Sequence, residues 1–281
     1  MKKLLLLFAL FAVALSATAS PTERWLDPEC FAVNRAPMRT SFIVFPTASE
    51  AVPENDYTRS PFYRTLNGEW AFLRAERPGA EPEGFFRTGY DDSSWGVMPV
   101  PGIWELNGYG DPVYTNKPYP WHKFFEVKPP LVPHEQNYTG LYRRTVRVPA
   151  DWKGRDAFIH IGSATSNVTL WVNGREAGYN EDSKNPAQYR IDPLLRPGEN
   201  TLALKMTRWS TGSYLEAQDF WRISGIERTV YLSAETPDAL RDFEVVSTLD
   251  DSYRTGLFTL KMFLAGDREV EAGYELLDPE G

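Results

Sequence analysis

Short runs of alternating apolar and polar residues dominate the middle of the chain, between about residues 141 and 232. Alternation with a period of two is typical of strands that bury one face. Turn-forming pairs separate the runs: Asn173-Gly174 is typical of a two-residue hairpin turn, and Pro197-Gly198 precedes a further run. Short strands spaced about 8–12 residues apart, with such turns between them, indicate a sandwich or jelly roll. Strands are therefore predicted over residues 141–148, 157–161, 168–172, 175–179, 201–207 and 228–232.

The chain before this stretch is also organised, although less regularly. Asn67-Gly68 followed by Glu69–Phe72 predicts a tight turn into a strand, and residues 99–102 begin a new extended segment. Residues 106–133 form a long loop that is rich in aromatic residues and proline. A loop of that length inside a compact domain is either functional or wrongly assigned. Together these patterns predict an all-β protein with one jelly-roll β-sandwich over residues 59–235.

The segment before the predicted sandwich has a different character. Residues 20–58 carry prolines at intervals that exclude a long helix or a central strand, yet they include Trp25, Phe31 and Phe42. Large apolar side chains on an extended segment are seldom left in water. We therefore expect residues 20–58 to form an extended N-terminal arm that lies across another surface of the protein.

After Pro237 the alternation resumes, and it predicts three further strands over residues 242–248, 256–264 and 270–277. Three strands are too few to close a sandwich, which needs about seven. We expect residues 236–281 to be the truncated start of a second β-domain, in a natural protein that continues further.

The first nineteen residues have the pattern of a targeting segment and differ from the rest of the chain. A basic start, Met1-Lys2-Lys3, precedes an unbroken apolar run over residues 4–15, and Ala17-Thr18-Ala19 is a cleavage site of small residues. This order is that of a secretory signal peptide, and the apolar run is too short to span a bilayer comfortably. We predict a signal peptide over residues 1–19, with the remaining chain exported to a periplasm or secreted.

Composition narrows the function classes. The chain is 42% hydrophobic and 14% aromatic, which excludes a disordered protein, and its 22 prolines suit an all-β fold with many turns. A formal net charge of −8 makes nucleic acid or an anionic membrane surface an unsuitable partner. A single cysteine, Cys30, excludes an internal disulfide and a cysteine-rich metal site.

The usual catalytic and cofactor motifs are missing, and the three histidines have no metal-ligand spacing. Two segments instead mix aromatic rings with amides, carboxylates and arginine: residues 114–121 and 208–226. Rings can cover the CH patches of a sugar while polar groups bond its hydroxyls. The alternative is structural: Trp209, Phe220 and Trp221 would be core residues, and Arg222 would pair with Asp219.

These segments carry a family resemblance. Residues 208–226 resemble the signature that follows the sugar-binding jelly roll of glycoside hydrolase family two, and the similarity runs from about residue 59 to 233. Other stretches resemble the β-galactosidase branch of that family in particular. The matching stretches are Leu66–Phe72, Pro99–Trp104, Tyr114–Pro120, Pro133–Arg143 and Trp171–Tyr179.

The resemblance implies a jelly roll, then an immunoglobulin-like β-sandwich whose start would be residues 236–281, then a (β/α)₈ barrel with two catalytic glutamates. Such enzymes retain anomeric configuration: one carboxylate attacks the anomeric carbon while the other serves as acid and base. No catalytic residue is therefore expected in this chain. The family uses magnesium and sodium, mainly through regions outside these residues, and we expect neither to be held by this chain alone.

Two residues inherit candidate roles from the resemblance. Asn116 corresponds to an asparagine that bonds galactose hydroxyls, so it is predicted to bind substrate. Thr211 stands where the family has an aspartate that binds a sodium ion and a galactose hydroxyl. A neutral hydroxyl is a weaker cation ligand than a carboxylate, so Thr211 is a substrate-binding candidate and a weakened sodium position.

The main hypothesis is the N-terminal portion of an exported, retaining β-galactosidase-like glycosidase that acts on terminal β-galactosides in carbohydrate breakdown. The alternative is a non-catalytic carbohydrate-binding module or a purely structural β-sandwich. The expected partners are a galactoside or related glycan and the rest of the same polypeptide. Nucleic acid and, after signal cleavage, membranes are not expected, and homo-oligomerisation stays open.

Overall fold

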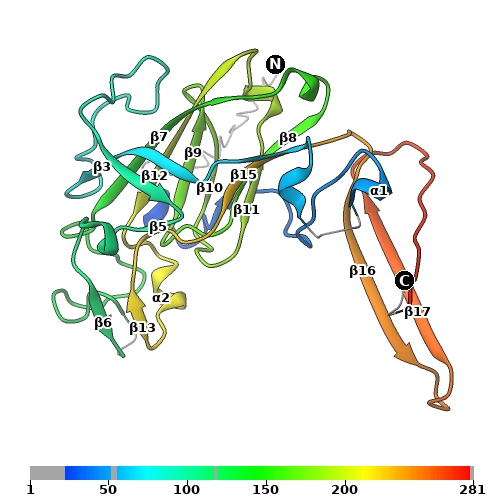
Figure 1. The fold of residues 1–281 in the computed structure, drawn as a ribbon. Helices are drawn as coiled ribbons and strands as arrows, with labels where there is room; N and C mark the ends of the chain where they lie inside the picture. Colours follow the sequence, from blue (N-terminus) through cyan, green and yellow to red (C-terminus); the bar gives the residue numbers. More distant parts are fainter. Residues whose placement is uncertain (1–22, 52–55, 117–118, 279–281) are drawn as a thin grey trace, which may run out of the picture.

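The computed structural model describes residues 23–51, 56–116 and 119–278, so the predicted signal peptide, residues 1–19, lies outside the described residues. Two antiparallel sheets pack face to face around a shared core (Figure 1). Among the described residues the α-helices are short, α1 (Ala48–Ala51) and α2 (Ser213–Glu216), and none is long and apolar enough to cross a membrane. The all-β fold class is confirmed.

The sheets have seven and four strands. In spatial order, the larger contains β1 (Ala32–Val33), β10 (Arg175–Asn180), β9 (Val168–Val172), β12 (Glu199–Thr207), β7 (Thr139–Arg147), β3 (Gly68–Ala75) and β4 (Gly96–Val100). The smaller contains β11 (Ala187–Arg190), β8 (Asp156–Ile161), β15 (Val230–Glu235) and β2 (Tyr63–Thr65).

Shorter elements connect and flank the sheets. They are β5 (Gly102–Ile103), β6 (Val113–Thr115), β13 (Phe220–Arg222), β14 (Gly225–Ile226), β16 (Leu240–Leu249) and β17 (Gly256–Leu264), with 3-10 turns η1 (Arg24–Leu26), η2 (Tyr57–Arg59), η3 (Glu105–Asn107), η4 (Ala150–Trp152) and η5 (Asp192–Leu194).

The six strands predicted from alternation are all present, as β7, β8, β9, β10, β12 and β15. The turn between β9 and β10 is the predicted hairpin: Asn173 and Gly174 both have positive φ, 52° and 81°, which this tight turn requires. The sequence analysis does not predict strand β11, because a run of four residues is too short for its alternation to identify a strand. It forms because its backbone pairs with β8 at the edge of the smaller sheet.

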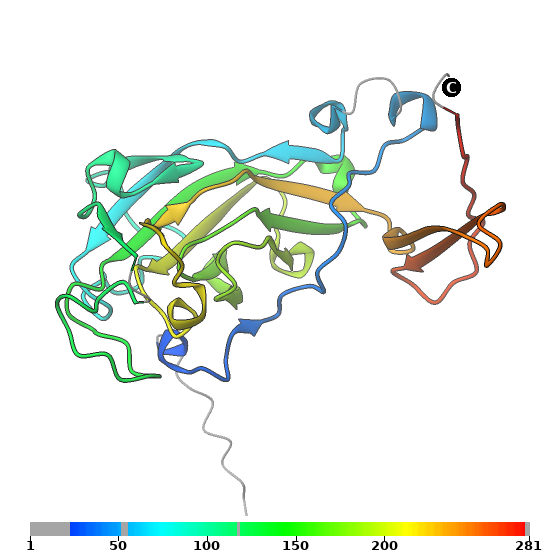
Figure 2. The same ribbon diagram turned by 90° about the horizontal axis from the view of Figure 1, so that it is seen from below.

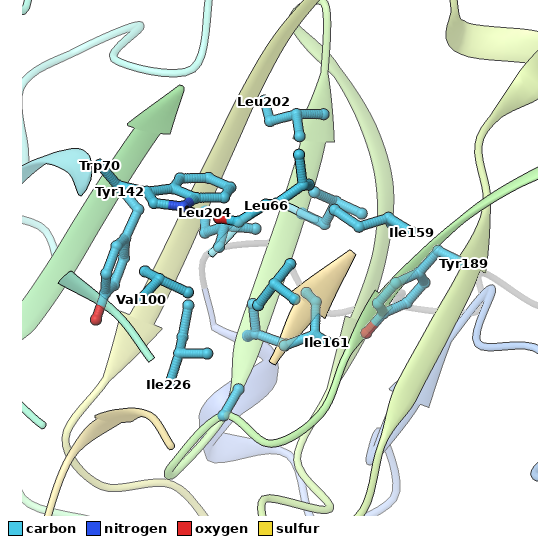
Figure 3. Packing of buried hydrophobic residues seen from close by; sticks show 14 of the residues in the cluster. Leu66, Trp70, Val100, Tyr142, Ile159, Ile161, Tyr189, Leu202, Leu204 and Ile226 are labelled. Atoms are coloured by element: carbon cyan, nitrogen blue, oxygen red, sulfur yellow. Dashed lines mark hydrogen bonds between the residues drawn. The ribbon is translucent and has the colours of Figure 1, made fainter. Parts of the chain in front are cut away.

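The core lies between the two sheets, where inward side chains interdigitate (Figure 3). Burying apolar area contributes about 25 cal/mol per Å², so these large side chains are the main source of stability. The indole N–H of Trp104 donates to the Tyr142 hydroxyl at 2.6 Å, and that indole lies against Gly140, where a Cβ would be 2.2 Å away. The close approach explains the glycine. Labelled core residues include Trp70, Tyr142, Ile159, Ile161, Tyr189, Leu202 and Leu204.

The long loop predicted over residues 106–133 is packed. A second buried cluster joins Trp121 and Val132 from this loop to Trp25 of the N-terminal segment and Trp209 after β12. Trp121 and Trp209 lie with ring centroids 5.4 Å apart, and Trp25 and Trp209 are each 3% exposed. The loop therefore has its own small core at one end of the sandwich.

The N-terminal segment, residues 23–51, runs along the sandwich, and we call it the strap (Figure 2). Its strand β1 pairs with β10 at the edge of the larger sheet, and Arg35 then bridges to Tyr189 of β11. The strap reaches the C-terminal ribbon, where the amide of Thr40 donates to Asp242 at 3.1 Å.

After β15 the chain forms a two-stranded ribbon, β16 and β17, which projects from the sandwich (Figure 1). The third predicted strand, over residues 270–277, is wrong: those residues form no strand. Alternation alone does not make a strand, because the backbone donors and acceptors also need a neighbouring strand.

Candidate functional site

The two aromatic and polar segments singled out in the sequence meet at one end of the sandwich. Strands β6 and β13 pair antiparallel, with Tyr114 opposite Trp221 and Thr115 opposite Phe220 (Figure 1). The Tyr114 hydroxyl donates to Asp219 at 2.7 Å, across 105 residues of sequence. We call this pair of strands the β6–β13 ribbon.

The ribbon exposes rings. Tyr114, Phe220 and Trp221 are 51%, 51% and 56% exposed, and the Tyr114 and Trp221 ring centroids lie 5.4 Å apart. The structural alternative is right for Trp209, which is buried, and wrong for Phe220 and Trp221. Exposed aromatic rings beside polar groups can stack on the CH faces of a polyol.

Asn116 follows β6 directly and is exposed. Its neighbour Thr115 is buried and pairs with Phe220, which lines the hollow described next. The structure thus puts Asn116 at the end of the ribbon, where its amide can offer a donor and an acceptor. Its role in binding substrate stays a prediction.

A hollow of about 310 Å³ lies between the ribbon, α2 and the segments that follow β8 and β10. We call it the ribbon hollow. One wall is aromatic, and the rim is polar and charged. Its lining includes Ser183, Lys184, Arg208, Trp209, Glu216, Asp219, Phe220, Trp221 and Arg222.

The charged groups of the ribbon hollow are held by neighbours. Lys184 pairs with Glu227 at 2.6 Å, and Glu216 accepts a hydrogen bond from the Ser183 amide at 2.8 Å. Burial raises the pKa of Glu216 and lowers that of Arg208. Fixed hydroxyl, carboxylate and guanidinium groups around a ring-lined hollow suit non-covalent binding of a polyhydroxylated ligand.

Thr211 lies on the other side of α2, in a different setting. Its side chain is buried, and its hydroxyl donates to Oε2 of Glu181 at 2.8 Å. The Gly212 amide donates to the same oxygen at 2.8 Å, and the Tyr179 hydroxyl donates to the other. Burial raises the pKa of Glu181 to about 7.

Thr211 and Glu181 line a second hollow of about 480 Å³, and Glu216 lines both hollows. Its rim is apolar and includes Phe31, 58% exposed, and Leu215, 86% exposed. Asn116 and Thr211 therefore belong to two neighbouring surfaces, on the ribbon and behind α2.

Sequence reasoning missed Glu181. An acidic residue two positions after the predicted strand 175–179 is an available signal, but its burial depends on packing against the loop at residues 210–212. Among the described residues, no group of three histidine, cysteine, aspartate or glutamate side chains is arranged as a metal site.

The chain matches a known family over most of the sandwich. The family model described as the sugar binding domain of glycosyl hydrolases family 2 covers residues 63–237. A β-galactosidase of Priestia megaterium is 39% identical over 242 residues, which are 86% of this chain and 23% of that protein. A β-galactosidase of Halalkalibacterium halodurans is 37% identical over 260 residues, 92% of this chain and 25% of that protein.

Solved structures share the fold. A β-glucuronidase from an uncultured Clostridium species superposes with a TM-score of 0.54 at 17% identity, covering 83% of this chain and 36% of that one. A β-glycosidase from Bacteroides vulgatus gives 0.52 at 22% identity, covering 72% and 24%. The chain spans about a quarter of the length of the curated relatives it matches. The resemblance drawn from the motifs is confirmed: the chain belongs to glycosyl hydrolases family 2 and contains its sugar-binding domain.

Proposed function

We propose that this chain is the N-terminal portion of an exported, retaining glycosidase that hydrolyses terminal β-galactosides, and that the β6–β13 ribbon forms part of the wall of its sugar pocket. The observation that carries the proposal is the pairing of β6 with β13. It brings Asn116, the exposed rings and the ribbon hollow to one end of the sandwich. Identity of 37–39% to β-galactosidases supports the substrate class.

In this proposal the chain binds and orients sugar, and bond cleavage belongs to two carboxylates of the catalytic barrel. One forms the glycosyl-enzyme bond, and the other protonates the leaving oxygen and then activates water. The ribbon contributes where its contacts tighten as the sugar ring approaches the transition state. Magnesium and sodium are proposed to act mainly through the rest of the polypeptide.

The test compares the full-length protein with the present chain. Purified full-length protein should hydrolyse a nitrophenyl β-galactoside, whereas residues 20–281 alone should show no turnover above a mock preparation. Turnover by the shorter chain, or none by the full-length protein against any β-galactoside tested, would overturn the proposal. Export is tested separately, by sequencing the N-terminus of the mature protein, which should start at Ser20.

A non-catalytic sugar-binding module is the second candidate, because the exposed rings of the ribbon also suit a binding surface that acts alone. Galactose titrated into the isolated chain and followed by NMR distinguishes the two. Saturable binding of galactose to the isolated chain, together with a gene that ends after this domain, would favour the module.

A further inference from the structure

The Glu181 carboxylate is buried without a cation beside it. The residue is 3% exposed, and within the described part of the chain it has no salt-bridge partner. Buried carboxylates are normally paired with cations, bound to metals or saturated with hydrogen bonds. Here three neutral donors converge on it: the hydroxyls of Tyr179 and Thr211 and the amide of Gly212.

Glu181 therefore joins three segments that are distant in sequence. It follows the end of β10, and its side chain holds the loop at Thr211 and Gly212 that leads into α2. Backbone bonds add the N-terminal strap: the Glu181 amide donates to the Phe31 carbonyl at 2.9 Å, and the Thr211 amide donates to the Trp25 carbonyl at 3.0 Å.

The same loop positions the ribbon hollow. Arg208 and Trp209 precede Thr211, Ser213 and Glu216 follow it, and all four line that hollow. Whatever fixes Thr211 also fixes this wall.

Position 211 is where the family resemblance places a sodium-binding aspartate, and the residues here do not fit that ion. Position 211 offers a neutral hydroxyl, which is a weaker cation ligand than a carboxylate, and Oε2 of Glu181 already accepts hydrogen bonds from that hydroxyl and from the Gly212 amide. Glu181 also packs closely on this loop: a Cβ built on Gly212 would lie 3.2 Å from the Glu181 carbonyl oxygen and 3.3 Å from Oε2.

We infer that Glu181 supplies, from the end of β10, the carboxylate that is missing at position 211, and that its hydrogen bonds to Thr211 and Gly212 hold this loop without a sodium ion. Glu181 is thus a positioning residue for the sugar pocket. The inference about the pocket rests on the proposed function, but the hydrogen-bonded junction does not.

The first test is a double-mutant cycle on residues 20–281, read as thermal unfolding. Thr211→Val keeps the side-chain shape and removes the hydroxyl, so it should lower Tm by about 3–8 °C, because buried acceptors lose a donor. Thr211→Ser is the matched control and should recover most of that loss. Glu181→Gln combined with Thr211→Val should cost less than the sum of the single changes. Additive losses, or equal losses for Ser and Val, would contradict the inference.

The second test measures the Tm of the unmodified chain in sodium chloride, potassium chloride and choline chloride at equal ionic strength. The three values should agree within about 1 °C, since the binding of an ion to the folded state alone would raise Tm. A sodium-specific rise that Glu181→Gln abolishes would overturn the inference by making Glu181 a cation ligand.

In the full-length protein, any sodium dependence of the KM for a nitrophenyl galactoside should be the same in Glu181→Gln as in the unmodified enzyme, because sodium is proposed to act through the rest of the polypeptide. A sodium dependence that Glu181→Gln abolishes would overturn the inference even if both stability tests agreed with it. Absence of galactoside hydrolysis would instead defeat the proposed function, and the two stability tests would still decide on the junction.

Discussion

Two ribbons leave the sandwich, and they are built in opposite ways. In the β6–β13 ribbon, Tyr114 and Asp219 bond across 105 residues of sequence, so the pairing depends on the whole fold. Strands β16 and β17 are neighbours joined by a short loop, where the Asp250 amide donates to the Thr255 carbonyl at 2.9 Å. The β6–β13 pairing therefore depends on the tertiary structure, whereas the β16–β17 pairing depends on local sequence.

Their exposed side chains also differ. The β6–β13 ribbon presents rings beside Asp219 and Arg222, a mixture suited to a polyol. The other ribbon exposes mainly aliphatic side chains, a surface that another protein element would cover. Exposed large side chains therefore indicate a ligand-binding surface on the β6–β13 ribbon and a surface for packing against protein on β16 and β17. The exposed side chains of β16 and β17 include Val245, Val246, Leu249, Leu257, Phe258, Phe263 and Leu264.

The largest effect is expected from Trp209→Ala, which removes a buried ring at the end of the sandwich that carries the β6–β13 ribbon. We expect a loss of about 3–5 kcal/mol in the free energy of unfolding, because a large cavity opens among Trp25, Trp121 and Val132. Urea denaturation measures it. Val246→Ala on the other ribbon is the control and should stay within about 0.5 kcal/mol. Equal effects would show that the β6–β13 end is not anchored by this cluster.

Asn116→Ala in the full-length protein tests the predicted sugar contact at the ribbon tip. The lost transition-state stabilisation should be about 1.5–3 kcal/mol, because a sugar hydroxyl is left unpaired. It should appear as a lower kcat/KM for a nitrophenyl galactoside, with the Tm unchanged. Unchanged kinetics with a lower Tm would mean that Asn116 is a turn residue instead.

The dependence of stability on pH should distinguish the part of the sandwich under the N-terminal strap from the end that carries the β6–β13 ribbon. Burial and the nearby Arg39 lower the pKa of His160 to about 4, from an ordinary value near 6.5. The unfolded chain therefore binds the proton more readily, so stability is full above pH 6.5 and falls by about 1–3 kcal/mol as the pH drops towards 4. Comparison with His160→Gln isolates this contribution from that of the carboxylates.

If the stability of the unmodified chain and that of His160→Gln fall in parallel between pH 6.5 and 4, His160 does not cause the loss of stability. His160 stacks on Tyr231 with centroids 4.4 Å apart, and both line a hollow together with Arg39 and Ser41 of the N-terminal strap. Hydrogen exchange should thus increase first along the strap, with the β6–β13 ribbon still protected.

The smallest effect is expected from Trp221→Ala. An exposed ring that stacks on a sugar contributes about 0.5–1.5 kcal/mol, which corresponds to a KM raised roughly 2- to 12-fold in the full-length protein. Leu257→Ala on the other ribbon is the matched control for losing an exposed apolar side chain and should leave KM unchanged. A similar rise in both variants would remove the functional distinction between the ribbons.

Much of the sandwich could be predicted from the sequence, because its determinants are local. Alternation within β7, β9 and β12 marks the face that packs in the core between the two sheets, and Asn173-Gly174 specifies its hairpin through backbone angles that few residue pairs adopt. The family could be identified for a related reason, since its motifs are contiguous stretches of sequence.

Other features depend on partners far along the chain. Strand β11 forms against β8, whereas residues 270–277 have a strand-like pattern without a strand. The structural alternative placed Phe220 and Trp221 in the core, yet they are exposed because β13 pairs with β6 outside the main sheets. No local pattern encodes that choice.

The sequence by itself determined six strands of the sandwich, the family and the candidate roles of Asn116 and Thr211. The tertiary structure decided what those residues lie beside: Asn116 at the end of an aromatic ribbon, and Thr211 bonded to a carboxylate that no motif had marked. The physical reason is that burial and hydrogen-bond partners are properties of packed segments. Glu181 became a buried acceptor when the strap, the end of β10 and the loop before α2 met around it.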